Sequence, residues 1–309
     1  MKVFNSISEF SDIKNPVLTL GMFDGVHIGH QAIIQNLNQI ANEIEGESVL
    51  LTFEPHPKVV LQKGFTGLQL LTTLEEKIKL LEKSGLQNLI IHPFTKDFSE
   101  FSSEEFVKDF LVNQINIHTL VIGYNHHFGK NREGNFEQLL GLSEKFDFHL
   151  EKIEEVKSEN KKISSTQIRK ALLNGNLAFV KNGLGRNYLL SGKVVHGDKI
   201  GRTLGFPTAN LEVEKYKLIP GNGVYIVKVI FQNQIYKGLL SIGTRPTVTN
   251  SNEKRMEVYI LDFDKEIYGE TLNLEFIEFI RDDMKFNSLE ELIEQMNLDK
   301  KTGEEFNLY

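Results

Sequence analysis

The chain has no cysteine and no long run of apolar residues. The absence of thiols excludes disulfide bonds, thiolate zinc sites and cysteine nucleophiles, and it fits a reducing cytoplasm, where we expect the protein to be. No apolar run approaches the ~20 residues that a helix needs to span a bilayer, so we expect no membrane partner. Residues 1–6 lack an apolar core followed by small residues, and we therefore expect no signal peptide.

The chain also lacks an excess of positive charge. Its 35 lysines and arginines against 42 aspartates and glutamates give a formal net charge of −7, so we expect no nucleic-acid partner. An acidic protein that handles phosphate must use local cations, helix termini and metal ions. At 309 residues the chain is long enough for two domains, and it contains no internal repeat.

A glycine-rich turn with two histidines, Gly21–His30, is the most informative segment. An apolar run, Val17–Leu20, precedes it and a helical pattern follows it, which predicts a strand, a turn and the start of a helix. Glycine lets the main chain approach a ligand closely, and the first turn of a helix favours an anion. The histidines add hydrogen-bond donors. We interpret the segment as a polyphosphate site; the alternative is a tight strand–helix connection.

The first part of the sequence alternates short apolar runs with amphipathic stretches, which predicts an α/β, Rossmann-like domain with a parallel sheet. The expected strands are Val17–Leu20, Ser48–Phe53, Asn88–His92, Thr119–Gly123 and Phe146–Ile153. The expected helices are His30–Glu43, Leu74–Ser84, Ser103–Asn113 and Phe136–Lys145. Ligands of such sheets bind beyond the carboxyl ends of the strands, so the glycine–histidine turn, Glu54–Pro57 and Gly123–His126 are expected at one rim.

From residue 188 the pattern changes to short alternating strands, which predicts a small antiparallel β-barrel. The expected strands are Tyr188–His196, Gly223–Phe231, Ile235–Gly243, Arg255–Phe263 and Leu272–Ile280. Gln232-Asn233 is expected to be a hairpin turn. A C-terminal helix is expected over Leu289–Met296. We therefore predict two domains, residues 1–185 and 186–309.

A second polar cluster, Ile163–Arg169, has hydroxyl residues typical of helix caps and an arginine one turn later. Hydroxyls, main-chain N–H groups and the guanidinium are together suited to phosphate, although capping alone also explains the hydroxyls. Gly-x-Phe-Asp-Gly-x-His-x-Gly-His with Ile-Ser-Ser-Thr-x-Ile-Arg resembles the nucleotidylyltransferase superfamily. With Thr52–Pro57 between them, these motifs are similar to the adenylyltransferase module of bacterial bifunctional riboflavin kinase/FAD synthetases.

The resemblance implies that FMN phosphate attacks the α-phosphorus of ATP and that pyrophosphate leaves. It implies that His27 and His30 face the ATP phosphates and that a set of residues closes over them, namely Ser164, Ser165, Thr166 and Arg169. Other implied nucleotide or phosphate contacts are Gly21, Phe23, Asp24, Gly25, Gly29 and Asn125. Positioning of the reactants and stabilisation of charge would accelerate the reaction, and no covalent enzyme intermediate is needed.

Asn125 lies in Gly123–Lys130, where the family has a Gly-x-Asp/Asn-x-x-Phe-Gly segment. His126 and His127 replace the family's commoner phenylalanine–arginine type of pair, which removes a fixed cation. The two adjacent histidines do not predict a metal site, because neighbouring side chains diverge and no third ligand is evident. His56, between two prolines, is interpreted as part of a rigid turn.

The segment Gly192–Asn210 closely resembles the flavokinase module, whose signature Gly-Arg-x-x-Gly-Phe-Pro-Thr-Ala-Asn it contains. We expect a rigid turn at Pro207–Asn210. The resemblance implies that Thr208 and Asn210 bind Mg-ATP, because their oxygens suit Mg²⁺. It also implies a phosphate-covering loop that contains Gly197, Gly201 and Arg202.

Family position points to Glu257 as the base near the attacking hydroxyl of the kinase reaction. Tyr259 stands where the family usually has histidine, and it shares a strand face with Glu257. Arg281 and Phe286 match a family segment near the flavin, although either could instead cap the last helix at the surface. Tyr225 is expected to pack inside the barrel.

The resemblance covers nearly the whole chain and implies two successive reactions. Riboflavin and ATP give FMN and ADP, and FMN and ATP then give FAD and pyrophosphate, with Mg²⁺ in both steps. The expected partners are ATP, riboflavin, FMN and FAD, and the expected state is a monomer or weak homo-oligomer. Three alternatives stay open: a kinase with a degenerate first module, an RNA-handling relative of class I aminoacyl-tRNA synthetases, and a flavin sensor without turnover.

Overall fold

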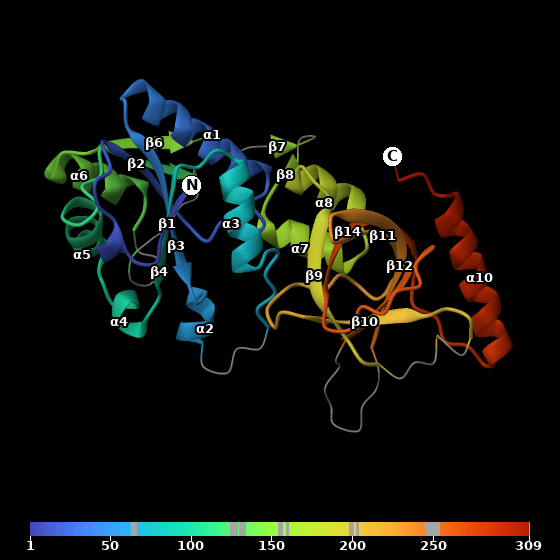
Figure 1. Cartoon of the computed structure of the whole chain (residues 1–309). Coiled ribbons are helices and arrows are strands. Elements are labelled where there is room, and N and C mark those ends of the chain that lie inside the picture. The colour runs from blue at the N-terminus through green and yellow to red at the C-terminus, as the bar shows by residue number, and fades with distance from the viewer. Residues whose placement is uncertain are drawn as a thin grey trace. The chain divides into compact units, whose positions relative to one another are not determined.

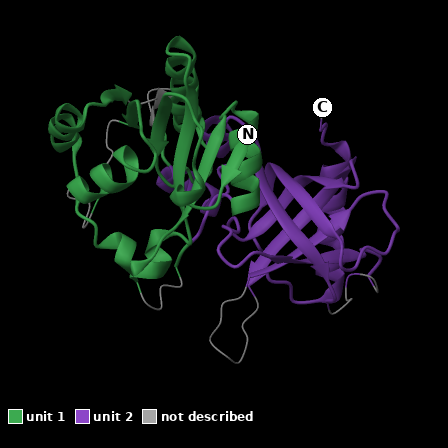
Figure 2. Cartoon of the chain, turned by 60° about the vertical axis from the view of Figure 1, so that its left-hand side comes forward, with its two compact units in different colours: residues 1–68, 74–164 green, residues 69–73, 165–309 purple. Residues whose placement is uncertain are grey.

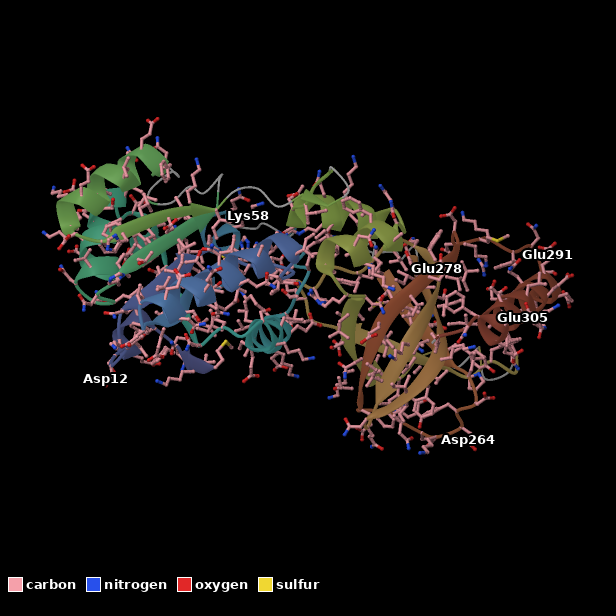
Figure 3. All side chains as sticks on the ribbon, turned by 90° about the horizontal axis from the view of Figure 1, so that it is seen from above. Asp12, Lys58, Asp264, Glu278, Glu291 and Glu305 are labelled. Atoms are coloured by element: carbon pink, nitrogen blue, oxygen red, sulfur yellow. The ribbon has the colours of Figure 1, made fainter. Side chains whose placement is uncertain are left out.

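The computed structural model describes residues 1–62, 67–123, 129, 134–153, 157–158, 161–197, 201, 204–244 and 254–308. The chain forms two compact units, one of residues 1–68 and 74–164 and the other of residues 69–73 and 165–309 (Figure 2). Charged side chains such as Asp12, Lys58 and Glu305 are exposed (Figure 3). None of the helices in the described ranges has the length and apolarity that crossing a membrane requires.

The first unit is built on a six-stranded parallel sheet in the order β1-β4-β3-β2-β5-β6 (Figure 1). Its strands are β1 Lys2–Phe4, β2 Pro16–Leu20, β3 Glu47–Glu54, β4 Asn88–Pro93, β5 Thr119–Gly123 and β6 His149–Ile153. All the predicted strands are present and the parallel sheet is confirmed, but β6 begins at His149 and not at Phe146, which is the last residue of a helix. β1 was not predicted, because a strand of three residues is too short to show an alternating pattern.

Two apolar cores cover the two faces of this sheet. Leu50 and Val121 belong to the core that contains residues of α1 and α3, whereas their neighbours Leu51 and Ile122 belong to the other core. Successive side chains of a strand point to opposite faces of the sheet, so a continuous run of apolar residues contributes to both cores. The helices are α1 Ile28–Glu43, α2 Pro57–Leu61, α3 Leu74–Lys83, α4 Lys96–Ser99, α5 Ser103–Glu105 and α6 Phe136–Phe146.

Short irregular elements complete the first unit. The helix predicted over residues 103–113 is α5 followed by a π-helical segment, η2 (Phe106–Val112). A 3₁₀ turn, η1 (Ile7–Glu9), follows β1. The short strands β7 (Lys157–Ser158) and β8 (Lys161–Lys162) pair with each other.

The second unit contains the predicted barrel, which closes in the order β10-β13-β12-β11-β14-β9 with antiparallel neighbours. Its strands are β9 Tyr188–Val195, β10 Thr208–Val213, β11 Gly223–Phe231, β12 Gln234–Thr244, β13 Lys254–Ile260 and β14 Thr271–Arg281. Gln232 and Asn233 have φ of 49° and 62° and join β11 to β12, which confirms the hairpin turn. Tyr225 is fully buried, as predicted.

Two local predictions in the second unit were wrong. Pro207–Asn210 is not a rigid turn, because strand β10 begins at Thr208 and pairs with both β9 and β13. Proline has no N–H to donate, so it fits immediately before a strand. The last helix, α10, covers Leu289–Glu305 and does not end at Met296; Lys237 holds its end by donating from Nζ to the carbonyl oxygens of Glu304 and Phe306.

Residues 69–73 belong to the second unit although they precede α3 in the sequence, and we call them the strap. Leu70 N donates to Tyr216 O at 2.6 Å, and Leu218 N donates to Leu70 O at 2.8 Å. The buried Lys217 donates from Nζ to Leu71 O at 2.8 Å. The strap is therefore held by main-chain pairing and by one buried ammonium.

Helices α7 (Ser165–Leu173) and α8 (Leu177–Leu184) also belong to the second unit. Arg169 of α7 donates from Nε to the strap carbonyl of Gln69 at 2.7 Å. The helix α8 ends at Gly185, whose φ of 70° suits glycine. The two compact units therefore meet in the sequence after Ser164. The boundary expected after residue 185 concerns the two functional modules, and it stays a prediction.

Candidate active sites

The glycine–histidine turn connects β2 to α1 and has an unusual backbone. Phe23 and Val26 have φ of 46° and 39°, and both side chains are buried. This region is rare for residues other than glycine, and for a β-branched valine it is a true outlier. Such strain costs about 1–3 kcal/mol, persists only where the surroundings enforce it, and concentrates at functional sites.

The two histidines of the turn are held by their contact with each other. His27 caps α1, and its Nδ1 accepts the main-chain N–H of His30 at 3.3 Å. The proton of a neutral His27 is therefore on Nε2. The two rings stack at 3.6 Å, and Phe23 stacks on His30 at 4.4 Å. Both imidazoles lie at the N-terminus of α1, where free N–H groups favour an anion.

Burial, followed by the charges of His27 and Lys77, holds the pKa of His30 well below its usual value. His30 is therefore neutral near pH 7 and has one N–H to donate. Its Nδ1 is buried, and among the described residues it has no hydrogen-bond partner. Buried polar atoms normally have such partners, so the unpaired Nδ1 is unusual and supports the prediction that the turn is a functional site.

Three segments were expected at one rim of the sheet. β2 and β3 are parallel neighbours, so the glycine–histidine turn and Glu54 lie at the same carboxyl edge, as predicted. β5 is the other neighbour of β2 and ends at Gly123. The residues that follow it and carry predictions, Asn125, His126 and His127, lie outside the described residues.

The remaining predicted residues of the first site are placed as follows. Gly29 lies against the ring of His27, where a Cβ would stand only 3.1 Å from the ring, so glycine makes room for the cap. Asp24 is 6% exposed, and Gly25 has φ of 84°. His56 caps α2 by accepting the N–H of Lys58 at Nδ1, so the predicted rigid turn opens into a short helix.

The residues expected to close over the phosphates lie where the two units divide in sequence. Ser164 ends the first unit, and α7 of the second unit carries Ser165, Thr166 and Arg169. Ser164 and Ser165 are half-buried and Thr166 is exposed. The guanidinium of Arg169 is engaged by the strap, so its phosphate role stays a prediction.

A second cluster lies on the outer face of the barrel, on the paired strands β10 and β13. Asn210 is opposite Glu257 and Thr208 is opposite Tyr259, so all four side chains share that face. Thr208 Oγ1 donates to Glu257 Oε2 at 3.1 Å, and Arg255 Nε lies 3.3 Å from Glu257 Oε1. Glu257 is thereby oriented while its side chain stays 31% exposed, which leaves it accessible to a substrate hydroxyl.

The oxygens of Thr208, Asn210 and Glu257 are hard ligands of the kind that suit Mg²⁺. Among the described residues, no group of three or more His, Cys, Asp or Glu side chains gathers to hold a metal. A divalent ion at β10 and β13 would therefore depend on phosphate oxygens as well. Gly197 lies directly against the Asn210 amide, and Gly201 against Phe206 O, where a Cβ would collide; Arg202 is outside the described residues.

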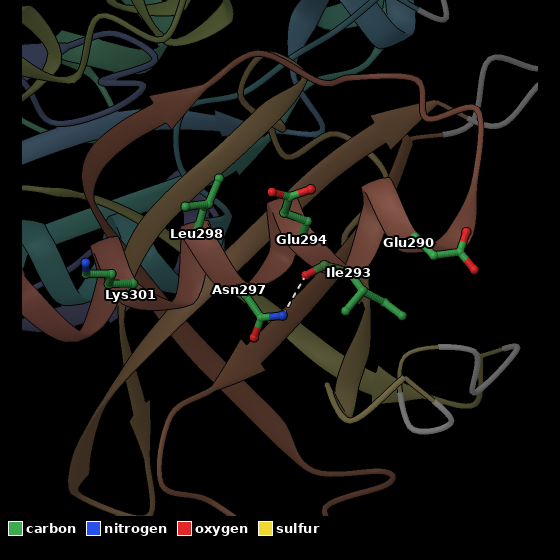
Figure 4. A pocket seen from close by; sticks show the side chains of 6 residues that line it. All are labelled: Glu290, Ile293, Glu294, Asn297, Leu298 and Lys301. Atoms are coloured by element: carbon green, nitrogen blue, oxygen red, sulfur yellow. Dashed lines mark hydrogen bonds between the residues drawn. The ribbon is translucent and has the colours of Figure 1, made fainter.

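A cavity of about 300 Å³ adjoins this cluster. Its lining is mixed: Val194, Val258, Ile260 and Ile267 are apolar, whereas Asp264, Lys265 and Glu266 are charged. Thr208 is the residue of the cluster that also lines the cavity. Apolar side chains beside charged and hydroxyl groups fit a ligand that combines an aromatic ring with polar substituents. By contrast, the hollow in Figure 4 is lined by α10 alone, so no groups from different elements converge there.

Arg281, predicted to bind flavin, forms a bidentate ion pair with Asp299 of α10. Its Nη2 and Nε lie 2.7 Å and 3.0 Å from the Asp299 carboxylate, which also accepts from Gln295. Phe286 is half-buried in the segment before α10. The pair attaches the last helix to the barrel, so the flavin roles of Arg281 and Phe286 stay predictions.

Asp299→Asn is expected to lower the free energy of unfolding by about 2 kcal/mol, because it leaves a largely buried guanidinium without its counter-charge. Chemical denaturation followed by circular dichroism measures the change. The control is Lys301→Gln, which removes an exposed ion pair to Glu305 and should change the stability by less than about 0.5 kcal/mol. Equal effects of the two substitutions would contradict the prediction.

An α/β sheet with a strained glycine–histidine turn and a barrel with an oriented carboxylate define a two-module, nucleotide-dependent transferase. Family models assign the modules: one for FAD synthetase matches residues 10–167 and one for riboflavin kinase matches residues 184–307. The chain belongs to the family of bifunctional riboflavin kinase/FMN adenylyltransferases.

Full-length relatives agree with that assignment. The bifunctional riboflavin kinase/FMN adenylyltransferase of Listeria monocytogenes is 40% identical over 96% of this chain and 94% of its own length. That of Escherichia coli K12 is 34% identical over 99% and 98%. A solved structure from Streptococcus pneumoniae, described as a macrolide-efflux protein, is 32% identical with a TM-score of 0.89 over 99% of both chains.

Proposed function

We propose that this chain makes FAD from riboflavin in two ATP-dependent steps, one in each module. Riboflavin is phosphorylated to FMN in the residue 186–309 module, and FMN is adenylylated to FAD in the residue 1–185 module with release of pyrophosphate. The observation that carries the proposal is that each module has its own charge-handling cluster, the histidine stack on α1 and the Thr208–Glu257 pair on the barrel.

In the first site, His27 and His30 stabilise the ATP phosphates as the FMN phosphate oxygen bonds to the α-phosphorus and the bond to pyrophosphate breaks. No proton has to move to the protein in this step, so a neutral His30 serves as a hydrogen-bond donor. The glycines and the N-terminus of α1 provide main-chain N–H groups for the same charge. Ser164, Ser165, Thr166, Arg169 and Asn125 complete the set.

In the second site, Glu257 accepts the proton of the riboflavin hydroxyl as that oxygen bonds to the γ-phosphorus of ATP and ADP leaves. Thr208 and Arg255 orient the carboxylate. Mg²⁺, held by Thr208 and Asn210 with ATP oxygens, would neutralise and align the phosphates. The cavity beside Thr208, with its apolar side chains, is suited to the adenine ring, and Gly197, Gly201 and Arg202 are suited to the phosphates.

We infer that the partners are ATP, riboflavin, FMN and FAD, with neither nucleic acid nor membrane, and that the enzyme works in the cytoplasm as a monomer or weak homo-oligomer. Net charge −7 supports the absence of a nucleic-acid partner. The RNA-handling alternative would be revived by salt-dependent binding of tRNA.

Incubation of the purified chain with riboflavin, ATP and Mg²⁺ tests the function. Chromatography is expected to show FMN first and FAD later, with one pyrophosphate released per FAD. Accumulation of FMN alone, also with FMN supplied as substrate, would favour the kinase with a degenerate first module. Flavin binding without either product would favour a sensor.

A further inference from the structure

A buried lysine, Lys77, lies against the glycine–histidine turn and has no part in the roles above. It lies on α3 and is 5% exposed. Its Nζ donates to the carbonyl oxygen of Met22 at 3.2 Å and to Thr52 Oγ1 at 3.4 Å. Met22 belongs to the turn and Thr52 to β3, so one ammonium group joins the turn to the sheet.

Burial of an ammonium group is costly unless charges and hydrogen bonds compensate for the lost hydration. Burial lowers the pKa of Lys77, and the negative charges of Glu54 and Asp24 oppose that shift. Asp24 is itself buried within the turn. Lys77 therefore balances the carboxylates at the carboxyl edge of the sheet, where the ATP phosphates would otherwise meet uncompensated negative charge.

Lys77 also acts on His30 through its charge. Among the residues that the structure describes, the charged groups that act on His30 are His27, on the same turn, and Lys77, on α3, and both lower the pKa of His30. His30 and His27 are fixed by ring stacking and by the cap hydrogen bond. A displacement of Met22 would thus be passed along the turn to both histidines.

We propose that Lys77 is a positioning residue of the adenylyltransferase site: its ammonium ties the turn at Met22 to β3 and fixes the His27–His30 stack for the ATP phosphates. The inference rests on the proposed function of the first site. Lys77 touches the turn rather than the reacting atoms, so it acts through the histidines.

The test compares Lys77→Met with Lys79→Met, a control on an exposed position of the same helix. Lys77→Met is expected to lower kcat/KM for FAD formation from FMN at least about tenfold, because displacement of reacting groups by about 1 Å can cost 10²-fold. The Lys79 variant should stay within twofold of the wild type. Riboflavin phosphorylation, measured in the same samples, should stay within twofold in both variants.

The pH profile separates positioning from a general loss of structure. With the charge of Lys77 removed, one cause of the low pKa of His30 is gone, so that pKa rises. His30 is then protonated at a higher pH, and the part of the pH profile of kcat/KM for FMN adenylylation that follows this protonation is expected to move to higher pH. Mere loss of folded protein would scale the profile without moving it.

Wild-type rates of FAD formation in Lys77→Met, with an unmoved pH profile, would overturn the inference. If Lys77→Met does not fold, Thr52→Val is the variant that tests the inference. It removes one hydrogen bond to the ammonium of Lys77 and keeps the shape of the threonine side chain. That variant is expected to lose FAD formation several-fold without loss of kinase activity, and an unchanged rate would overturn the inference. Failure of the wild type to make FAD would instead refute the proposed function.

Discussion

His30→Ala is expected to stop the chain at FMN. Riboflavin should be phosphorylated at the wild-type rate, while the conversion of FMN to FAD falls by about 10²–10³-fold, the usual effect of removing one preorganised donor at a site of developing charge. The substitution also removes the ring that stacks between Phe23 and His27, so His27 loses its stacking partner and keeps only the cap hydrogen bond to the main-chain N–H of residue 30. A chromatographic time course with riboflavin and excess ATP measures both steps in one sample.

The matched control for His30→Ala is His149→Ala, which replaces an exposed histidine of β6 in the same sheet. This variant should make FAD at the wild-type rate. FAD formation by His30→Ala at a rate close to that of His149→Ala would show that the glycine–histidine turn is not the adenylyl-transfer site.

Glu257→Gln is expected to stop riboflavin phosphorylation and to leave FAD formation from FMN intact. Riboflavin phosphorylation should fall by about 10²–10⁴-fold, the range that a positioned general base contributes, because the amide keeps the shape but cannot accept the hydroxyl proton. FAD should still form when FMN is supplied, since the first site is untouched. Separate assays with riboflavin and with FMN measure the two rates.

Glu278→Gln provides the control for Glu257→Gln, because Glu278 is an exposed strand carboxylate of the same barrel (Figure 3). Both activities should be unchanged in it. If Glu257→Gln phosphorylates riboflavin as fast as the Glu278 variant, Glu257 is an ordinary surface carboxylate oriented by Thr208 and is not the base.

The sequence predicts the strands and turns well where the burial of a segment sets its pattern of apolar and polar residues. β2 is buried along its whole length because helices cover both faces of the sheet, and its apolar run was visible in the sequence. Gln232-Asn233 predicted the hairpin because a tight turn requires positive φ at both residues. The glycine–histidine turn was equally readable, since its spacing is fixed by one strand end and one helix start.

The sequence predicts poorly what depends on distant partners. Lys77 is one charge in an amphipathic helix, and its local pattern does not reveal that Met22 and Thr52 lie against it. Thr208–Val213 forms a strand because β9 and β13 pair with it, which the proline before it concealed. The contact of Arg169 with Gln69 joins positions 100 residues apart, so it could not be expected from the helix-cap motif.

The strap has a consequence for the time at which the second unit is completed. The chain leaves the ribosome from its N-terminus, and domains generally fold in that order. The hydrogen bond to the carbonyl oxygen of Leu71, however, cannot form until Lys217 has been synthesised, 146 residues later. The strap therefore stays incompletely paired until residues 216–218 have been synthesised, and nascent chains that end before Tyr216 contain the complete glycine–histidine turn but not the partners of Leu70 and Leu71 in that segment.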